Sequence, residues 1–348
     1  MFIFCDKVSN IVDLSKDYKS TAYKKVLGKE IVERFSDKIE GDLELKNMYS
    51  QQNQKELQSW ENSIPEILSV IADSGLEDLF VVFEYVLPVG MNRIDCTVIG
   101  RNKKDEVCIL VVELKQWVNI YNDLENTNPC KVKLSINDIE RYHPLAQIQT
   151  YSKYLESNHS FCVGDNVNIY KCAYLHNFED KEQLFKKPYD IYRKSFYDLT
   201  FTKNDEEDLK KKLNEIFINK SDYTDVEAFC NGSYTTGESG LEELHNILNN
   251  KSVITLLEEQ RDIISLFSNR LSTIKNDNER IVEVISGNVG SGKTYLAFEM
   301  LRRAIGKFGN SNCFYTLVNA TVRDVIEGTF DSKIALYTDS VAKINENK

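Results

Sequence analysis

Two acidic residues and a lysine stand at the ends of, or inside, segments with the composition of β-strands. The run Val107–Val112 is apolar at every position, which is typical of a central strand covered on both faces. Glu113 and Lys115 follow it with one residue between them, so a strand would point both side chains to one face. Asp95 lies 18 residues before Glu113 in a second strand-like run, RIDCTVIG, and antiparallel pairing of the two runs could bring the carboxylates together.

These three side chains could carry out metal-assisted hydrolysis of a phosphodiester. Asp95 and Glu113 offer oxygen ligands to a hard divalent cation, for which Mg²⁺ fits best and Mn²⁺ can substitute. Glu61, on the helix expected before the strands, could supply one more oxygen. The cation would polarise the phosphodiester and lower the pKa of a bound water, while Lys115 could orient that water or stabilise developing charge. The competing interpretation is a structural ion-pair cluster, because charged groups at the end of a buried strand need partners.

A glycine-rich segment in the C-terminal third fits a phosphate-binding loop. GNVGSGKT matches G-x-x-x-x-G-K-[ST] in full and stands between a Val/Ile-rich run and an amphipathic helix pattern. Its glycines would let backbone N–H groups turn toward the phosphates of ATP, with Lys293 neutralising the β- and γ-phosphates and Thr294 binding Mg²⁺. A chance match in a loop is the alternative. The predicted cradle consists of Gly287, Asn288, Val289, Gly290, Ser291, Gly292, Lys293 and Thr294.

The other motifs expected of an ATPase domain are only partly present around this loop. Gln260, 33 positions before Lys293, could read the adenine amide pattern, or it could be an exposed helix residue. Only 55 residues follow Lys293, and they contain no apolar strand ending in an acidic pair. We therefore expect the ATPase domain to be incomplete in this chain, and we do not expect hydrolysis of ATP by the chain alone.

The elements expected around Asp95 and Glu113 follow the order α-β-β-β-α-β. Apolar residues near the 3.6-residue period predict a helix over 55–74, and a second helix is predicted over 144–156 with Pro144 in its first turn. Runs rich in Val, Ile and Phe, bounded by turn formers, predict the strands. These strands are 79–87, 93–100, 107–114 and 167–175. Residues 204–217 have the pattern of a charged surface helix.

A second domain is expected after the turn-rich segment NGSYTTGESG, residues 231–240. Its pattern is that of a β-loop-α-β unit, the start of a parallel sheet. The expected helices are 241–248, 254–273 and 293–305, and the expected strands are 280–285 and 313–318. The predicted division is an N-terminal extension at 1–50, a first domain at 51–235 and a partial ATPase domain at 236–348.

Composition sets the class of protein. The chain has 348 residues, of which 42% are hydrophobic, and at about 150 residues per domain this predicts roughly two domains with proper cores. The longest apolar run has six residues, so we expect no membrane span and no partner membrane, and no secretion signal is visible. The net charge of −11 argues against a general polyanion binder. Eight cysteines without a CxxC pair indicate reduced thiols and a cytoplasmic location.

The pattern resembles two known groups of proteins. Asp95 followed by Glu113-Leu114-Lys115 on an αβββαβ order resembles the PD-(D/E)XK nuclease core, and Gln147 with Tyr151 matches the QxxxY signature of its RecB-like members. The resemblance implies that the Leu114 carbonyl also binds metal, and that Gln147 and Tyr151 line the site and contact the DNA backbone.

A wider set of motifs resembles the Schlafen group 3-like DNA/RNA helicase proteins, which pair a nuclease-like region with a helicase domain. This resemblance covers about residues 55–330. The motifs that carry it are SWENSIP, FEYVLPVGMNRID, VVELKQW, HPLAQIQTY, LLEEQ and the phosphate cradle.

The expected fold is therefore α/β: a restriction-endonuclease-like αβββαβ core followed by the start of a parallel-sheet P-loop NTPase domain. The expected function is Mg²⁺-dependent hydrolysis of nucleic acid, with DNA favoured over RNA, coupled to an ATP-binding helicase-like domain. One alternative is a non-catalytic module that binds nucleic acid or a partner and uses ATP for regulation. Another is an ATPase fragment with a structural N-terminal domain. Homo-oligomerisation stays open.

Several further residues have two interpretations each. Arg93 could bind a scissile phosphate or pair with a carboxylate, and His143 could approach a phosphate or only begin the helix after it. A group of basic residues could line a nucleic-acid groove or be dispersed surface charge. This group is Lys103, Lys104, Lys131, Lys133 and Arg141.

Overall fold

The computed structural model describes most of the chain and divides it into two compact units, Met1–Thr235 and Thr236–Lys348. The division falls in the turn-rich segment 231–240. The described residues are 2–49, 54–87, 93–121, 128–135, 140–163, 167–234, 247–248, 256, 258–274, 282–287, 292–309, 312–316 and 335–337.

Unit 1 is built on a six-stranded mixed sheet with the order β1-β2-β3-β4-β7-β8. The first four strands pair antiparallel, whereas β4, β7 and β8 run parallel. A parallel pair needs a crossover connection, and the helix α5 lies in the connection between β4 and β7. The strands are β1 (Phe4–Lys7), β2 (Phe80–Val86), β3 (Arg93–Arg101), β4 (Val107–Lys115), β7 (Val167–Leu175) and β8 (Thr200–Thr202). The α/β class is thereby confirmed.

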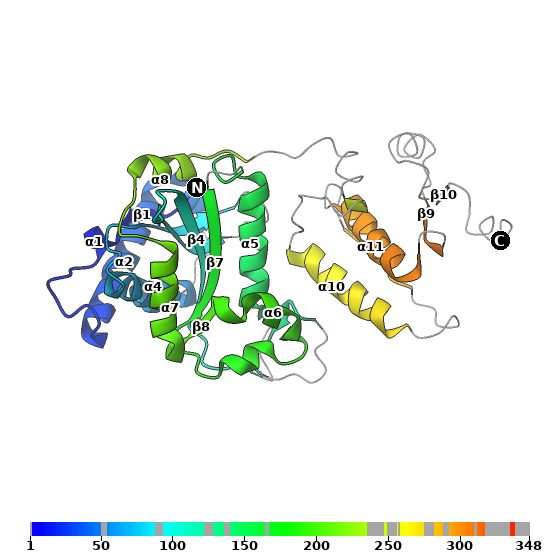
Figure 1. Ribbon diagram of the computed structural model, residues 1–348, viewed down its shortest axis with the longest axis horizontal. Helices are drawn as coiled ribbons and strands as arrows, with labels where there is room; N and C mark the ends of the chain where they lie inside the picture. The colour runs from blue at the N-terminus through cyan, green and yellow to red at the C-terminus, as the bar shows by residue number, and fades with distance from the viewer. Residues whose placement is uncertain are drawn as a thin grey trace. The chain divides into compact units, whose positions relative to one another are not determined.

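Helices cover both faces of this sheet (Figure 1). On one face, here called the α4 face, α2 (Thr21–Gly41), α4 (Gln54–Asp73) and α7 (Glu206–Ile216) share a core with alternate strand residues. The other face, the α5 face, is covered by α5 (Pro144–Asn158) and α8 (Tyr223–Cys230). The predicted order α-β-β-β-α-β corresponds to α4-β2-β3-β4-α5-β7.

Strand β4 shows how the two faces divide. Its residues Cys108, Leu110, Val112 and Leu114 lie in the α4-face core, while Ile109 and Val111 pack with Tyr151 and Leu155 of α5. The strand is buried on both sides, as its unbroken apolar run predicts. The odd-numbered residues that follow, Glu113 and Lys115, therefore point to the α5 face.

Smaller elements complete unit 1. The two-stranded sheet of β5 (Lys131–Val132) and β6 (Arg141–Tyr142) precedes α5. Short helices lie at α1 (Val8–Ile11), α3 (Leu43–Met48) and α6 (Arg193–Phe196). Four 3₁₀ turns are η1 (Lys181–Phe185), η2 (Tyr189–Tyr192), η3 (Tyr197–Leu199) and η4 (Lys203–Asp205).

The first 49 residues are part of this unit and not an extension to it. Strand β1 pairs with β2 at the sheet edge, and α2 buries Leu27, Ile31, Phe35 and Ile39 on the α4 face. These four residues recur every fourth position among charged residues, so they form one narrow stripe that average composition conceals. Gly28 lets the two helices approach, because a Cβ there would come within 2.2 Å of the Glu61 carbonyl oxygen on α4.

Truncation of Phe35 tests whether this segment belongs to the core. The ring is 1% exposed and packs edge-on against Trp60 with ring centroids 5.2 Å apart. Phe35→Ala should lower the free energy of unfolding of unit 1 by about 3–5 kcal/mol, because the cavity cannot refill. Both tryptophans, Trp60 and Trp117, lie in unit 1, so tryptophan fluorescence in urea reports this transition. Val26→Ala, at a site 56% exposed on the same helix, should change it by less than about 0.5 kcal/mol; equal effects would contradict the packing.

Unit 2 contains two packed helices and a pair of parallel strands among its described residues. These are α10 (Glu258–Thr273), α11 (Lys293–Phe308), β9 (Phe314–Thr316) and β10 (Ala335–Tyr337). They correspond to the predicted helices 254–273 and 293–305 and the predicted strand 313–318. Most of the predicted helix 241–248 lies outside the described residues.

Residues 282–285 of the predicted strand 280–285 are described and belong to no strand, whereas 280 and 281 lie outside the described residues. Val282 and Val284 are 85% and 89% exposed. A β-rich sequence forms a strand only when a neighbouring strand accepts its hydrogen bonds, and none of the described residues does so here. Across the described parts of both units, no helix combines the length and the apolar character needed to cross a bilayer.

Candidate functional site

Asp95 and Glu113 lie opposite each other on neighbouring strands. The last paired residues of β3 and β4 are Cys96 and Val112, and one further step in this antiparallel register places Asp95 opposite Glu113. The backbone N–H of Leu114 donates to Asp95 Oδ2 at 2.8 Å, so the aspartate side chain takes the place of a ladder acceptor. The structure thus brings the two predicted carboxylates to one end of the β3–β4 pair.

Glu113 and Lys115 form an ion pair at the same place. The Glu113 side chain is 1% exposed, and its Oε1 is in contact with the Lys115 ammonium. Lys115 Nζ also lies 5.7 Å from the ring centroid of Trp117. A buried carboxylate persists only with such a partner, because its desolvation is otherwise uncompensated.

Helix α5 brings Gln147 and Tyr151 to this face. Tyr151 packs in the same core as Ile109 and Val111 of β4, directly before Glu113 in the strand. Gln147 Nε2 donates to the Tyr151 hydroxyl at 3.2 Å, one helical turn apart. The two QxxxY residues therefore lie over the sheet face to which Glu113 and Lys115 point.

Glu61 lies on α4, and its Cγ and carbonyl oxygen lie against Gly28 of α2. The next residue, Asn62, donates from its side-chain amide to Gln116 Oε1 at 3.0 Å, just past the end of β4. That Glu61 supplies a further carboxylate stays a prediction. Among the described residues, the one acidic trio close enough to share an ion is Asp73, Glu206 and Glu207, which lies away from the Asp95 row. Each carboxylate of that trio already has an ion-pair partner, Lys19 or Lys210.

Glu84 was not among the predicted site residues. The β2–β3 register, with Phe83 paired to Cys96 and Tyr85 paired to Ile94, places Glu84 opposite Asp95. It is the one charged residue of a seven-residue buried strand, FVVFEYV, and a lone acidic residue in an otherwise apolar run was the signal available in the sequence. Burial raises the pKa of Glu84 to about 7 against the opposing effect of the Arg93 charge.

Arg93 pairs with carboxylates, as the second of its two interpretations expects. Its Nε lies 3.2 Å from Glu84 Oε2, and its Nη2 donates to Glu56 of α4. The guanidinium also lies 4.7 Å from the ring centroid of Tyr49. These partners occupy the Arg93 guanidinium, whose side chain is 31% exposed.

His143 begins α5 and is fully buried. Its Nδ1 accepts from the Leu145 N–H at 3.2 Å, and its ring lies 4.7 and 5.1 Å from those of Tyr189 and Tyr192. Of its two interpretations, the structure supports the helix-capping role. Burial lowers the pKa of His143 to about 3.

This lowered pKa predicts a pH-dependent stability. Because the unfolded histidine titrates near 6.5 and the folded one near 3, the unfolded chain takes up the proton first. The contribution of His143 is therefore complete above about pH 6.5 and falls by about 1.4 kcal/mol per pH unit below it. Urea unfolding gives the free energy of unfolding at pH 7 and at pH 5, and the native chain should lose stability between the two. In His143→Asn, which keeps a capping side chain, this loss should be about 2 kcal/mol smaller. Equal losses would contradict the burial.

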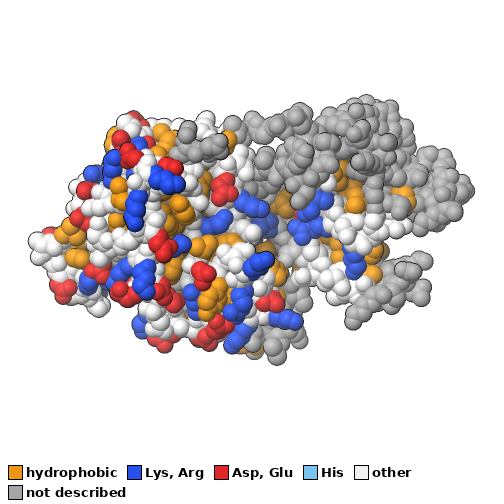
Figure 2. Space-filling model, viewed as in Figure 1, with side chains coloured by type: hydrophobic (Ala, Val, Ile, Leu, Met, Phe, Trp, Pro, Cys, Tyr) orange, Lys and Arg blue, Asp and Glu red, His pale blue; other side chains and the backbone are white. Residues whose placement is uncertain are grey.

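Four of the five basic residues fall into two groups, and Lys133 forms an isolated β-bridge with Tyr121. Lys131 and Arg141 lie on β5 and β6, next to the start of α5, and Lys131 Nζ lies 3.2 Å from the Tyr142 ring centroid. Lys103 and Lys104 follow β3, at the opposite end of the strands from Asp95. On the face of unit 1 drawn in Figure 2, basic and acidic side chains are interspersed.

The predicted nucleotide cradle is described in part. Residues 288–291 lie outside the described residues, so Asn288, Val289, Gly290 and Ser291 are not placed. Gly292 has φ 76°, a left-handed conformation that favours glycine, and it leads directly into α11. Lys293 Nζ donates to the Gly287 carbonyl at 2.8 Å, bridging the two sides of the loop.

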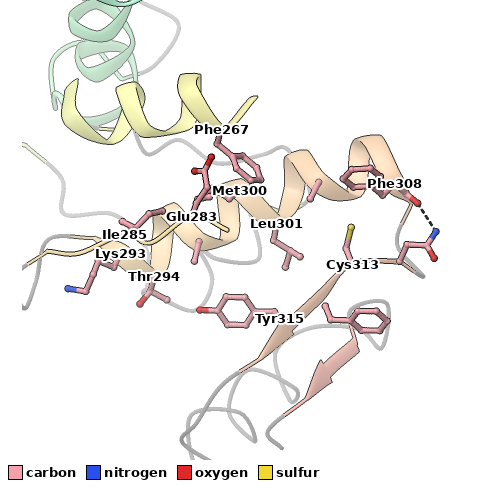
Figure 3. Close-up of a pocket in the computed structure, with 14 residues that line it drawn as sticks. Phe267, Glu283, Ile285, Lys293, Thr294, Met300, Leu301, Phe308, Cys313 and Tyr315 are labelled. Atoms are coloured by element: carbon pink, nitrogen blue, oxygen red, sulfur yellow. Dashed lines mark hydrogen bonds between the residues drawn. The ribbon is translucent and has the colours of Figure 1, made fainter. Parts of the chain in front are cut away.

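Gln260 lies beside this loop. A Cβ on Gly292 would come within 2.5 Å of Gln260 Nε2, so the amide reaches the cradle from α10. An open cavity of about 630 Å³ runs along α11 in unit 2, with Lys293 and Thr294 at one end and Phe308 at the other (Figure 3). The structure thus brings Gln260 and the described end of the cradle together.

Comparisons with protein-family models, with curated proteins and with solved structures find no match for this chain. The sites above therefore stand on their own geometry.

Proposed function

We propose that the chain is a metal-dependent nuclease that hydrolyses phosphodiester bonds of nucleic acid, with DNA as the favoured substrate. The observation that carries the proposal is the row at the end of the β3–β4 pair, where Asp95 holds the Leu114 amide and lies opposite Glu113. The order α4-β2-β3-β4-α5-β7 around this row supports a PD-(D/E)XK core.

The donors present fit a hard divalent cation. Asp95 has a second carboxylate oxygen beside the one that holds Leu114 N–H, Glu113 supplies a buried carboxylate, and the Leu114 carbonyl belongs to the residue directly after Glu113. All three are oxygen donors, which suits Mg²⁺ or Mn²⁺ and disfavours softer metals. When bound, the cation would polarise the phosphodiester and lower the pKa of a water ligand.

The remaining residues have roles that follow from their positions. Lys115 holds Glu113 in place and can offer its ammonium to the water or to the developing negative charge. Gln147 and Tyr151 would contact the phosphate backbone of the bound strand, since their polar ends meet over the same face. Lys131 and Arg141 extend positive charge away from the start of α5.

Unit 2 would bind ATP at the cradle Gly287–Thr294. Thr294 would bind Mg²⁺, and Gln260 would hydrogen-bond to the adenine. The left-handed Gly292 and the bridge from Lys293 to Gly287 support this assignment. We do not extend the proposal to ATP hydrolysis or strand unwinding, for which no catalytic carboxylate can be assigned among the described residues of unit 2.

Cleavage assays with and without Mg²⁺ on single- and double-stranded DNA and RNA test the proposal. The native chain should cleave only with the cation, and Asp95→Asn, which keeps an acceptor for Leu114 N–H, should not. Calorimetry with Mn²⁺ then separates the alternatives. If no Mn²⁺ binding depends on Asp95, the result would instead favour a non-catalytic module that only binds nucleic acid or a partner.

A further inference from the structure

The sheet of unit 1 changes its pattern at the row that contains Asp95. In a regular strand, residues two apart point to the same face. Phe83 lies in the α4-face core, however, while Tyr85 lies in the α5-face core, and their partners Cys96 and Ile94 divide in the same way. The alternation of both strands therefore reverses between these pairs, at Glu84 and Asp95.

Glu84 has the backbone conformation that accompanies this reversal. Its φ is 53°, in the left-handed region that side-chain-bearing residues seldom occupy. The β2–β3 ladder omits the Glu84–Asp95 row and resumes at the next one. Conformations of this kind persist only where the surroundings hold them, and they re-aim neighbouring side chains.

The carboxylate of Glu84 is held from three directions on the α4 face. Trp60 Nε1 donates to Oε1 at 2.8 Å, the Tyr49 hydroxyl donates to Oε2 at 3.3 Å, and Arg93 Nε lies 3.2 Å from Oε2. These donors come from α4, from the end of α3 and from β3. Because these contacts satisfy it on the α4 face, Glu84 is not itself placed to bind a cation with Glu113.

We infer that Glu84 is a positioning residue that acts through Asp95. Its anchored carboxylate fixes the left-handed turn of β2, and this turn releases Asp95 from the ladder so that its carboxylate reaches the Leu114 amide on β4. The metal-binding part of this inference rests on the proposed function. The hydrogen bond between Asp95 and Leu114 does not, so the two can be tested separately.

Hydrogen exchange at the Leu114 amide is the first readout. In Glu84→Ala this amide should exchange about tenfold faster than in the native chain, because its acceptor is displaced. The Leu110 amide, in the regular part of β4 opposite Val98, should keep its protection. Glu56→Ala is the matched control, since it removes the other carboxylate partner of Arg93, and it should leave Leu114 unchanged.

Glu84→Gln provides the conservative variant and guards against misfolding of the alanine variant. It keeps an acceptor for Trp60 and Tyr49 but loses the charge beside Arg93, so Leu114 exchange should lie between those of the native chain and Glu84→Ala. The inference is overturned if Leu114 keeps native protection in both Glu84 variants. It is equally overturned if Leu110 loses protection to the same extent, which would mark a purely global role.

Calorimetry with Mn²⁺ is the second readout. Residues that orient a metal ligand typically change affinity by 10–100-fold, so Glu84→Ala should weaken binding about tenfold relative to Glu56→Ala. If the native chain binds no Mn²⁺ at all, the proposed nuclease function fails, while the exchange measurement still decides the role of Glu84. Native affinity in a Glu84→Ala variant that has lost Leu114 protection would refute the link to the metal.

Discussion

Glu113→Gln is expected to reduce Mg²⁺-dependent cleavage by about 10³-fold, since removal of a charged metal ligand costs several kcal/mol of transition-state stabilisation. The substitution keeps the shape of the side chain and an oxygen acceptor for Lys115, so the fold should persist. Initial cleavage rates at saturating Mg²⁺, on the substrate that the native chain cleaves best, measure the effect.

The control for this variant is Glu156→Gln on α5, where the carboxylate is 43% exposed. Its rate should stay within about twofold of native, because an exposed surface charge contributes little. Lys115→Met should also abolish cleavage, but it leaves the buried Glu113 carboxylate without its ion-pair partner and is expected to lower stability as well. Native rates in Glu113→Gln would remove this residue from the mechanism.

Lys293→Ala is expected to weaken ATP binding by about 10–100-fold, the loss of one charge-assisted contact worth about 1.5–3 kcal/mol. The ammonium already bridges the loop by donating to the Gly287 carbonyl, so it is placed where phosphates would enter. Titration calorimetry with ATP and Mg²⁺ measures the change. Cleavage by unit 1 without ATP should not change.

Lys307→Ala removes an ammonium from the other end of α11, where it donates to the Ile274 carbonyl. This control should leave ATP affinity within about twofold of native, because the residue lies some four turns from the cradle. Equal losses in the two variants would show that the effect is one of helix stability. Unchanged affinity in Lys293→Ala would contradict the cradle.

The elements that carry Asp95 and Glu113 could be predicted because their signals are local. The unbroken apolar run of β4, the 3.6-residue period of α4 and the proline at the start of α5 each specify one element. Once β3 and β4 pair antiparallel, their register alone places Asp95 opposite Glu113. The positions of Asp95 and Glu113 therefore followed from short-range patterns plus one strand pairing.

Other features depended on contacts between distant segments. The apolar residues of α2 form a single narrow stripe, so only their packing against α4 shows that they belong to the core. The prediction for Glu61 rests only on the place of its helix before the strands, and no sequence signal tells how that helix packs against the strand ends. Glu84 depends on Tyr49, Trp60 and Arg93 together, and the segment 282–287 lacks the paired neighbour that its composition anticipates.

A crystal structure of the chain soaked with Mn²⁺ tests the central claim most directly. Anomalous scattering should reveal an ion bound by the carboxylates of Asp95 and Glu113 and by the carbonyl oxygen of Leu114, and the ion should be absent from Asp95→Asn. An anomalous peak only at Asp73, Glu206 and Glu207, or none at saturating Mn²⁺, would contradict a metal-dependent nuclease site in this sheet.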